Sequence, residues 1–447
     1  MTTVTGPAPT GADHWDPEDR AFWERTGART ARRNLTMSVV CEHLGFSVWS
    51  LWSVLVLFLG PGYHVDPAGK FTLTALPTAL GALLRLPYAF ALTRFGGRTW
   101  TVVSVLLLLV PTALAALVLT PGVSYGTLLA VACAAGVGGG GFASSMANIN
   151  AFYPHRLKGW ALGVNAGGGN LGVPGVQLLG LLVLATAGAE HPRLLPLLYP
   201  PLVLAAAALA RRRMDDLPPA ARGSVAAGSL REVARDRYGW AVSALYIGTF
   251  GSFIGFGFAF GQVLQTQFHD RFDTPVKAAA LTFLGPLLGS LLRPVGGRLA
   301  DRFGGPRVTL AAFAAMGAGA ATVLVASRAG SLPLFLAGFI ALFVLSGLGN
   351  GSTYKMIPAH YEARARAAVA AGTDPAAAAA AARRRTSALI GLAGTIGAFG
   401  GVLVNLAFRE SFAAGGNGDT AYLVFLAAYV CCAALTWTVW LRPGARR

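Results

Sequence analysis

Twelve apolar segments recur along this chain, each long enough to cross the hydrocarbon core of a lipid bilayer. They lie near residues 35–60, 71–93, 100–120, 126–153, 160–186, 194–210, 241–265, 277–298, 308–327, 332–357, 386–407 and 421–441. A helix needs roughly 20 predominantly apolar residues to span a core about 30 Å thick. Because lipid offers no hydrogen-bond partners, the backbone of such a segment must bond to itself, as it does in a helix. Only 12% of the residues are charged, against roughly 25% in soluble domains. The pattern predicts an all-α integral membrane protein of about twelve transmembrane helices.

The positively charged residues are unevenly divided between the two sets of loops that these segments define. The termini and alternate loops hold 27 Lys and Arg residues, whereas the opposite loops hold six. Loops rich in Lys and Arg stay on the cytoplasmic side. We therefore expect a multi-pass protein of the inner (cytoplasmic) membrane, surrounded by the lipid bilayer, with both termini in the cytoplasm. The net charge of +17 does not indicate nucleic-acid binding, because it is spread over loops between spans.

Polar stretches divide the chain into two groups of six spans. The predicted units are a cytoplasmic N-terminal segment at 1–34, an N-terminal six-helix half at 35–210, a cytoplasmic linker at 211–240, a C-terminal six-helix half at 241–441 with a cytoplasmic insert at 360–385, and a cytoplasmic tail at 442–447. Segment 1–34 lacks the pattern of a cleavable signal, so we expect the first span to direct insertion. Composition favours solvated loops for the linker and the insert. The alternatives are a helical stretch near 230–237 and a short helix that starts at Asp374-Pro375.

Two arginines lie inside apolar segments, at equivalent places of an internal repeat. Arg85 lies in the sequence GALLRLP and Arg293 in GSLLRP, and nine residues after each arginine an identical run, Arg-Phe-Gly-Gly, begins. A charge at membrane depth costs at least ~2.5–3.5 kcal/mol on insertion scales, so such a residue is a candidate for function. Two charges of the same sign in equivalent places indicate an anion site shared by the two halves of a transporter.

Glycine-rich segments also repeat between the halves. The segment 136–142 has a counterpart at 347–354, and 167–172 in the fifth span has a counterpart at 394–401 in the eleventh. Small residues let membrane helices approach closely, so we expect these glycines to form tight helix contacts that slide during a transport cycle. Direct contact of their backbone with an anion is the alternative. The glycines concerned are Gly167, Gly168, Gly169, Gly394, Gly397, Gly400 and Gly401.

Several of these segments resemble known signatures. The run GRLADRFGG at 297–305 resembles the cytoplasmic signature of the major facilitator superfamily, whose fold has two pseudo-symmetric six-helix halves. The earlier copy, at 93–98, lacks the aspartate. ALGVNAGGGNLG at 161–172 and GLAGTIGAFGG at 391–401 resemble the two nitrate signatures of the nitrate/nitrite porter family of that superfamily. The resemblance implies that the substrate is bound by Arg85, Arg293, Asn170, Tyr246, Phe250 and Phe142.

The chemistry of these residue types suits a small planar anion. Nitrate is a flat monoanion with three acceptor oxygens, and a guanidinium is a flat, permanently charged fork of donors. Two arginines from opposite halves can hold the anion by charge-assisted hydrogen bonds. Asn165 and Asn170 can add neutral amide donors, although Asn165 can equally join two helices. Tyr246 and Phe250 share a helix face, and with Phe142 they can either line the site or pack in the core.

We expect nitrate/nitrite transport by alternating access, with exchange of the two anions. Closing an empty site would bring two arginines together at low dielectric, where like charges repel, whereas a bound anion offsets the repulsion. A proton-coupled nitrate symporter is the alternative mechanism. Glu42 and His43 form the only adjacent titratable pair in a span, and can bind the coupled proton or lie wetted at the cytoplasmic mouth. A major facilitator carrier for another small anion, such as an organic anion or a drug, is a further alternative.

Other functional classes find no support in the sequence. It contains no metal-ligand cluster, no nucleophile–base set and no phosphate-binding loop, so we expect no enzyme, no metal and no cofactor. All four cysteines fall in the spans, which indicates small buried residues and no disulfide framework. We expect a monomer whose partners are nitrate, nitrite and the bilayer, with no nucleic acid.

Overall fold

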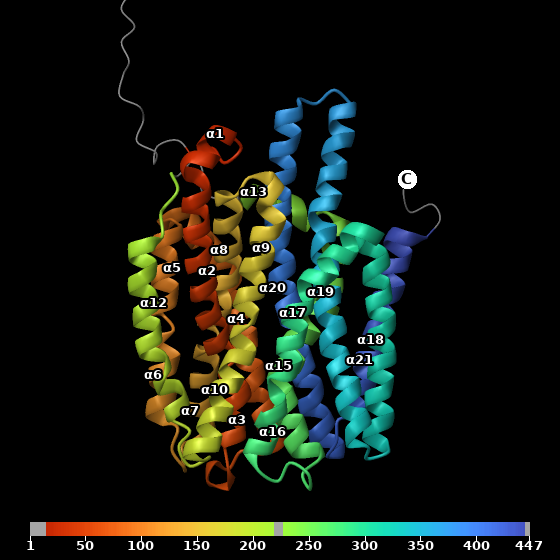
Figure 1. The fold of residues 1–447 in the computed structure, drawn as a ribbon. Coiled ribbons are helices and arrows are strands. Elements are labelled where there is room, and N and C mark those ends of the chain that lie inside the picture. The colour runs from red at the N-terminus through yellow and green to blue at the C-terminus, as the bar shows by residue number, and fades with distance from the viewer. Residues whose placement is uncertain (1–14, 219–226, 443–447) are drawn as a thin grey trace, which may run out of the picture.

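The computed structural model describes residues 15–218 and 227–442, and all regular secondary structure within these ranges is helical. Twelve helical stretches there are long and apolar enough to cross a membrane, which confirms the predicted number of spans. They run side by side as a bundle (Figure 1). The first six spans form the N half and the last six form the C half, and in Figure 1 the two halves lie next to each other.

The N half contains spans that are mostly interrupted by short breaks in the helix. Its spans are Arg20–Phe58 (α1 Arg20–Phe22, η1 Trp23–Gly27, α2 Ala28–Trp49 and α3 Trp52–Phe58), Pro67–Phe95 (α4), Gly97–Val118 (α5 Gly97–Leu106 and α6 Leu109–Val118), Tyr125–Phe152 (α7 Tyr125–Ala134 and α8 Val137–Phe152), His155–Ala187 (α9 His155–Asn170 and α10 Gly172–Ala187) and Leu194–Arg213 (α11 Leu194–Leu197 and α12 Tyr199–Arg213). A short turn of helix, η2 Pro61–Tyr63, lies between its first two spans.

The C half contains the two longest helices. Its spans are Arg237–Gln267 (α14 Arg237–Tyr246, η4 Ile247–Gly251 and α15 Ser252–Gln267), Pro275–Phe303 (α16 Pro275–Thr282 and α17 Leu284–Phe303), Gly305–Arg328 (α18), Leu332–Ala370 (α19), Pro375–Gly415 (α20) and Asp419–Leu441 (α21 Asp419–Thr436 and η5 Trp437–Leu441). A separate short helix, α13 Ala227–Ala234, lies in the predicted linker.

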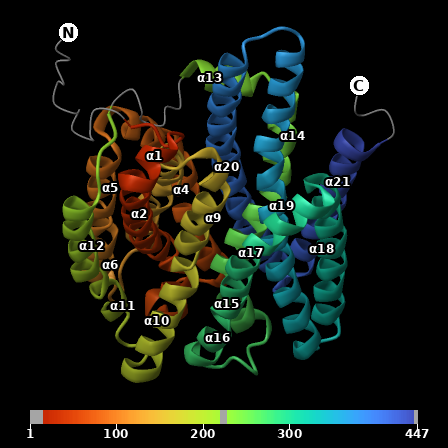
Figure 2. The same cartoon turned by 45° about the horizontal axis from the view of Figure 1, so that its top comes forward.

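The bundle has two distinct ends. We call the end that carries α1, α13, the turn between α19 and α20, and the end of η5 the terminal face (Figures 1 and 2). The opposite end, the distal face, carries the short connections of both halves, such as 119–124 and 268–274. Near the distal face of the bundle, side-chain hydrogen bonds join the two halves. They are Thr74 to Asn405 at 2.7 Å, Gln177 to the Gly257 carbonyl at 2.8 Å, and Gln262 to the Pro67 carbonyl at 2.6 Å.

The first helix begins earlier than the apolar segment at 35–60. Asp19 caps it by accepting hydrogen bonds from the backbone N–H groups of Ala21 and Phe22. Before the helix, the Trp15 ring packs edge-on against Phe152 at the end of α8, with ring centroids 5.1 Å apart. The polar N-terminal segment is therefore helical from Arg20 on and docks on the terminal face, while residues 1–14 lie outside the described ranges.

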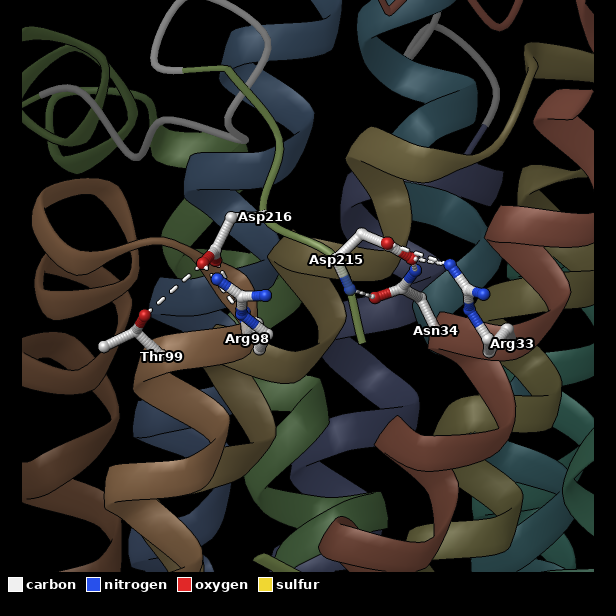
Figure 3. Close-up of polar contacts among 6 residues, drawn as sticks. All are labelled: Arg33, Asn34, Arg98, Thr99, Asp215 and Asp216. Carbon is white, nitrogen blue, oxygen red and sulfur yellow. Dashed lines mark hydrogen bonds and ion pairs between the residues drawn. The ribbon is translucent and has the colours of Figure 1, made fainter. Parts of the chain in front are cut away.

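The start of the linker is bound to the N half. Arg33 and Asn34 of α2 both donate to the Asp215 carboxylate, at 2.6 and 2.9 Å (Figure 3). The Asp216 carboxylate accepts from the backbone N–H of Arg98, near the start of α5, at 2.8 Å. Aspartate at a helix N-terminus is favoured by the helix dipole and by unpaired backbone N–H groups. Residues 215 and 216 thus fix the linker to two helices of one half.

The end of the linker is bound to the C half, and here the expected loop is wrong. Residues 227–234 form α13, close to the helical alternative near 230–237, while 219–226 lie outside the described ranges. The Glu232 carboxylate accepts from Arg385 of α20 at 2.7 Å, and Asp236 accepts from Arg364 of α19 at 3.0 Å. Leu230 packs against clusters in both halves, so α13 lies where the halves meet on the terminal face.

The loop expected for the insert at 360–385 is also wrong. Helix α19 runs without interruption to Ala370, and α20 starts at Pro375 with Asp374 as its N-cap, the residues named in the helical alternative. The two helices form a hairpin that projects from the terminal face (Figure 1). Gly372 has φ of 96° in the turn, a conformation that favours glycine. Alanine has the highest helix propensity, so the alanine-rich stretches continue the two spans as helix.

Candidate functional site

The two arginines lie buried where the halves meet. Arg85 of α4 is fully buried and Arg293 of α17 is 7% exposed. The Arg85 guanidinium donates through Nε to the Gly139 carbonyl of α8 at 3.3 Å and through Nη1 to the Gly394 carbonyl of α20 at 2.6 Å. Gly139 belongs to the N half and Gly394 to the C half, so Arg85 bonds across the interface between them.

Aromatic rings surround the two guanidinium groups. The Phe250 ring centroid lies 5.1 Å from the Arg85 Cζ and 6.0 Å from the Arg293 Cζ, so one ring contacts both charges. Phe142 lies 4.9 Å from the Arg85 Cζ and stacks on Phe250 at 6.3 Å. The Tyr246 ring also stacks on Phe250, with ring centroids 5.2 Å apart. The Tyr246 hydroxyl accepts a hydrogen bond from Arg293 Nη2 at 2.9 Å. The electron-rich ring faces stabilise both cations within the apolar core.

Each arginine has a buried Nη donor without a hydrogen-bond partner among the described residues. Arg85 Nη2 and Arg293 Nη1 are buried, and neither has a hydrogen-bond partner within the described part of the chain. Buried donors are nearly always paired in folded proteins, so unpaired donors on two cations indicate a ligand or water site. Because one donor comes from each half, a ligand held by both would lie on the boundary between the halves.

The two predicted asparagines have different environments. The Asn170 side chain is 1% exposed, and neither its amide nitrogen nor its oxygen has a partner among the described residues. Asn165 donates through Nδ2 to Ser145 Oγ at 2.6 Å, which joins α9 to α8. The amide of Asn165 is therefore used to join two helices, which is one of the two roles that the sequence left open for it. The amide of Asn170 remains available to a ligand.

Four of the predicted glycines make contacts within their own half. A Cβ atom on any of them would meet a neighbouring helix closely, which explains why only glycine fits there. Gly168 packs against Val39, Gly169 against Glu42, Gly397 against Tyr246 and Gly400 against Gly251. These four glycines let helices of the same half approach each other closely, and the sliding expected of them stays a prediction.

Two other glycines face the opposite half. A Cβ atom on Gly394 would lie 3.3 Å from Arg85 Nη1, and one on Gly401 would lie 2.9 Å from a methyl group of Thr78. Gly167 has no atom within 4 Å of the place where its Cβ would be. Gly394 and Gly401 thus lie at the boundary that must change in a transport cycle, and the carbonyl of Gly394 already serves as a hydrogen-bond acceptor for Arg85.

Glu42 is buried deep in the N half, so the expectation of a wetted pair at the cytoplasmic mouth is wrong for this residue. Its side chain is 7% exposed, its Oε2 has no hydrogen-bond partner among described groups, and it interacts electrostatically with Arg85. His43 is partly exposed. A small cavity beside Glu42, which the two arginines do not line, is bordered by hydroxyl groups: Ser38, Thr101, Ser104, Ser144 and Ser145.

Sequence reasoning did not identify every residue around the arginines. The Trp49 ring lies 5.5 Å from the Arg85 Cζ, and the Tyr354 ring lies 5.6 Å from the Arg293 Cζ. Aromatic residues are frequent in membrane spans, so neither tryptophan nor tyrosine gives a signal of its own there. The carbonyl groups of Gly139 and Gly394 that bond Arg85 carry no sequence signal beyond the glycines themselves. No group of three or more metal-ligating side chains occurs in the described ranges.

Comparison with known proteins places this arrangement in a family. Residues 37–404 match the Major Facilitator Superfamily. The chain is 40% identical over 450 residues to "Nitrate/nitrite transporter NarU" of Salmonella typhimurium (strain LT2), with 96% of each chain covered. It is 30% identical over 460 residues to "Probable nitrate/nitrite antiporter NarK2" of Thermus thermophilus, with 97% of each covered.

Among solved structures, the fold is similar to that of a D-xylose-proton symporter, with a TM-score of 0.67 and 15% sequence identity over 91% of this chain and 97% of that one. This likeness confirms the predicted fold of the major facilitator superfamily, and at this identity it shows the fold alone. The family and the fold are those of transporters, which agrees with the expectation that the chain is no enzyme. The chain therefore belongs to the nitrate/nitrite porter family of the major facilitator superfamily.

Proposed function

We propose that this protein transports nitrate and nitrite across the cytoplasmic membrane of a bacterium by alternating access, and that it exchanges one anion for the other. The observation that carries the proposal is the pair of buried arginines, one from each half, that contact the same Phe250 ring and each keep an unpaired donor. The names of the relatives in Salmonella typhimurium and Thermus thermophilus support the choice of substrate.

Binding draws on the unpaired groups of both halves. Arg85 Nη2 and Arg293 Nη1 supply charge-assisted hydrogen bonds to oxygens of the anion, and the Asn170 amide is a further donor. The rings of Phe142, Phe250 and Tyr246 exclude water and present flat apolar surfaces to a flat ligand. A planar oxyanion can satisfy two planar guanidinium groups at once, whereas a spherical ion has no matching geometry.

The charge of the site supports the exchange mode. No carboxylate lies within 4 Å of either guanidinium in the described part of the chain, since the ion pairs found there involve other arginines. An empty site therefore holds two buried cations that oppose closure, and a bound anion offsets this repulsion in both directions of the cycle. This supports an exchange mode, in which reorientation requires a bound anion.

Proton-coupled uptake is the second candidate, and the burial of Glu42 favours it. A buried carboxylate with an oxygen that has no partner in the described part of the chain can bind a proton together with the anion and lose it again when the anion is released. This candidate requires Glu42 to change its protonation state in every cycle, which the exchange mode does not.

The orientation in the membrane follows from charge. The termini and alternate loops hold 27 Lys and Arg residues, and the described parts of these segments lie at the terminal face, which supports a cytoplasmic position for that face.

Uptake of labelled nitrate into proteoliposomes tests the function. Vesicles preloaded with nitrite or nitrate should take up label, empty vesicles should not, and a proton ionophore should have no effect. External nitrite should compete for the same site, and chloride should compete poorly. Absence of nitrate uptake under every preload would refute the transport function, whereas ionophore-sensitive accumulation in empty vesicles would favour the proton-coupled candidate.

A further inference from the structure

Helix α19 lies very close to α17 at the level of Arg293. A Cβ atom on Gly351 would overlap the backbone carbonyl of Arg293, and one on Gly347 would overlap the carbonyl of Gly289. Two glycines one turn apart thus let the backbones of the two helices touch. The close approach brings the next residue on this side of α19, Tyr354, against the guanidinium group of Arg293.

Tyr354 contacts the site through its ring. Its centroid lies 5.6 Å from the Arg293 Cζ and 6.1 Å from the ring of Tyr246, which itself bonds Arg293. The side chain therefore lies beside Arg293, and it is the last residue of the repeated glycine-rich segment 347–354.

The Tyr354 hydroxyl is buried and has no hydrogen-bond partner among the described residues. Burying a hydroxyl without a partner is unfavourable, so such groups are rare in folded proteins. The other buried tyrosine hydroxyls of the C half all have partners: Tyr246 with Arg293, Tyr361 with Asp236, Tyr422 with Gln267 and Tyr429 with Ser252. Tyr354 is thus the exception in its half, and it lies beside the unpaired Nη1 of Arg293.

We propose that the Tyr354 hydroxyl is a substrate-binding donor that favours nitrate over nitrite. The inference rests on the proposed function and assigns a specificity-determining residue to that site. Arg85 Nη2, Arg293 Nη1 and the Tyr354 hydroxyl provide three unpaired donors, and nitrate has three acceptor oxygens. Nitrite has only two oxygens, so the three donors cannot each bond a separate oxygen of it.

A neutral donor has a further advantage in this place. A third cation would increase the repulsion that opposes closure of the empty site, since like charges interact strongly at low dielectric. A hydroxyl adds a hydrogen bond to the bound anion and leaves the charge of the empty site unchanged. Tyr354 can therefore raise the affinity for nitrate without changing the charge that makes reorientation depend on an anion.

The test compares Tyr354→Phe with the parent protein in nitrite-loaded and nitrate-loaded proteoliposomes. The variant keeps the ring and loses only the hydroxyl. We expect the KM for nitrate to rise about tenfold, as for a lost hydrogen bond to an ion. The KM for nitrite should rise clearly less, and the maximal rate should stay within about twofold of the parent. Tyr429→Phe is the matched control, because it removes a buried hydroxyl of the same half that is bonded to Ser252 away from the arginines.

Thermal unfolding in detergent, with and without nitrate, measures binding independently of transport. Nitrate should stabilise the parent and the control variant, and should stabilise Tyr354→Phe only at about tenfold higher concentration. An unchanged nitrate KM, or equal rises for nitrate and nitrite, would overturn the inference while leaving the proposed function intact. If the parent itself neither exchanges nor is stabilised by nitrate, the proposed function fails, and the role of Tyr354 fails with it.

Discussion

At the scale of single residues, the geometry around Arg85 explains why a positive charge alone could not replace its guanidinium group. Its Nε and Nη1 atoms bond carbonyl groups of opposite halves, and Nη2 remains for a ligand. These three roles require the fixed planar fork of a guanidinium. A lysine ammonium is a single point donor on a flexible stem and cannot fill them together.

Replacing either arginine by lysine should therefore nearly abolish transport. We expect Arg85→Lys and Arg293→Lys each to lower nitrate/nitrite exchange by about a hundredfold or more, which corresponds to losing one or two charge-assisted hydrogen bonds. The measurement is counterflow in proteoliposomes at equal protein content. Arg366→Lys, at an exposed position on α19, should behave as the parent. Near-normal exchange by either site variant would contradict the paired-fork site.

From the sequence, site residues can be predicted where their chemistry is unusual for a membrane span. A charge such as Arg85 or an amide such as Asn170 is rare there, so its presence indicates a site. Tyr354 and Trp49 give no such signal, because aromatic side chains occur throughout the spans. Only the structure shows that the Tyr354 hydroxyl is buried without a partner, since this depends on the close approach of two helices.

At the scale of elements, the glycines of α20 control how the site is assembled. Gly397 leaves room for the ring of Tyr246, which holds Arg293 through its hydroxyl. Gly391, two turns earlier on the same helix, has no atom within 4 Å of where its Cβ would be. Substitution by alanine should therefore impair the site at Gly397 and leave it nearly unchanged at Gly391.

Gly397→Ala should displace Tyr246 and lower nitrate exchange by about tenfold or more, because small misplacements of binding groups have large effects. Gly391→Ala should stay within about twofold of the parent, since the added methyl group meets open space. Exchange rates and membrane abundance of both variants check this. Equal activities would show that the contact with Tyr246 does not position the site.

The helix α13 should hold the two halves together at the terminal face. Leu230 packs against Ala89 and Ala143 of the N half and against a C-half cluster that includes Leu389. The Arg385 guanidinium lowers the pKa of the Glu232 carboxyl through their hydrogen bond, so this pair stays ionised at neutral pH and is lost only as the pH falls through the lowered pKa. Exposed ion pairs contribute little to stability, so the partly buried side chain of Leu230 should matter more.

Leu230→Asp should open this face. Asn150 of α8 donates to Ser387 of α20 at 3.3 Å, so cysteines at these two positions should form a disulfide across the halves in a background without the native cysteines. We expect Leu230→Asp to lower the disulfide yield several-fold. Arg231→Ala, on the exposed side of α13, should leave it unchanged. An unaltered yield in Leu230→Asp would show that α13 does not hold the halves together.

At the scale of the whole molecule, periodicity and charge predict the bundle of twelve spans but not its extension beyond the membrane. The arginines at 383–385 and the polar residues from His360 on end the apolar pattern, so the sequence favours a loop there. The structure continues both spans as helix because alanine stabilises helix in water as well as in lipid, and Gly372 provides the turn.

Coupling is a property of the complete transport cycle, and variants of Glu42 and His43 test which of the two modes operates. In pure exchange, Glu42→Gln and His43→Ala should exchange nitrate for nitrite at the parent's rate under every pH gradient, because neither group takes part. In proton-coupled uptake, both variants should lose accumulation into empty vesicles while keeping exchange. Uptake assays with an acidic exterior, with and without a proton ionophore, separate the two outcomes.

The hairpin of α19 and α20 extends the C half far beyond the anion site. Gly394, whose carbonyl bonds Arg85, lies on the same uninterrupted helix as the turn, about 28 Å from Pro375 at 1.5 Å per residue. A small rotation of the C half around the anion therefore becomes a much larger sweep at the tip of the hairpin. Each reorientation in the membrane is thus amplified into a visible movement in the aqueous phase, which a fluorophore on Thr373 would register without touching the anion.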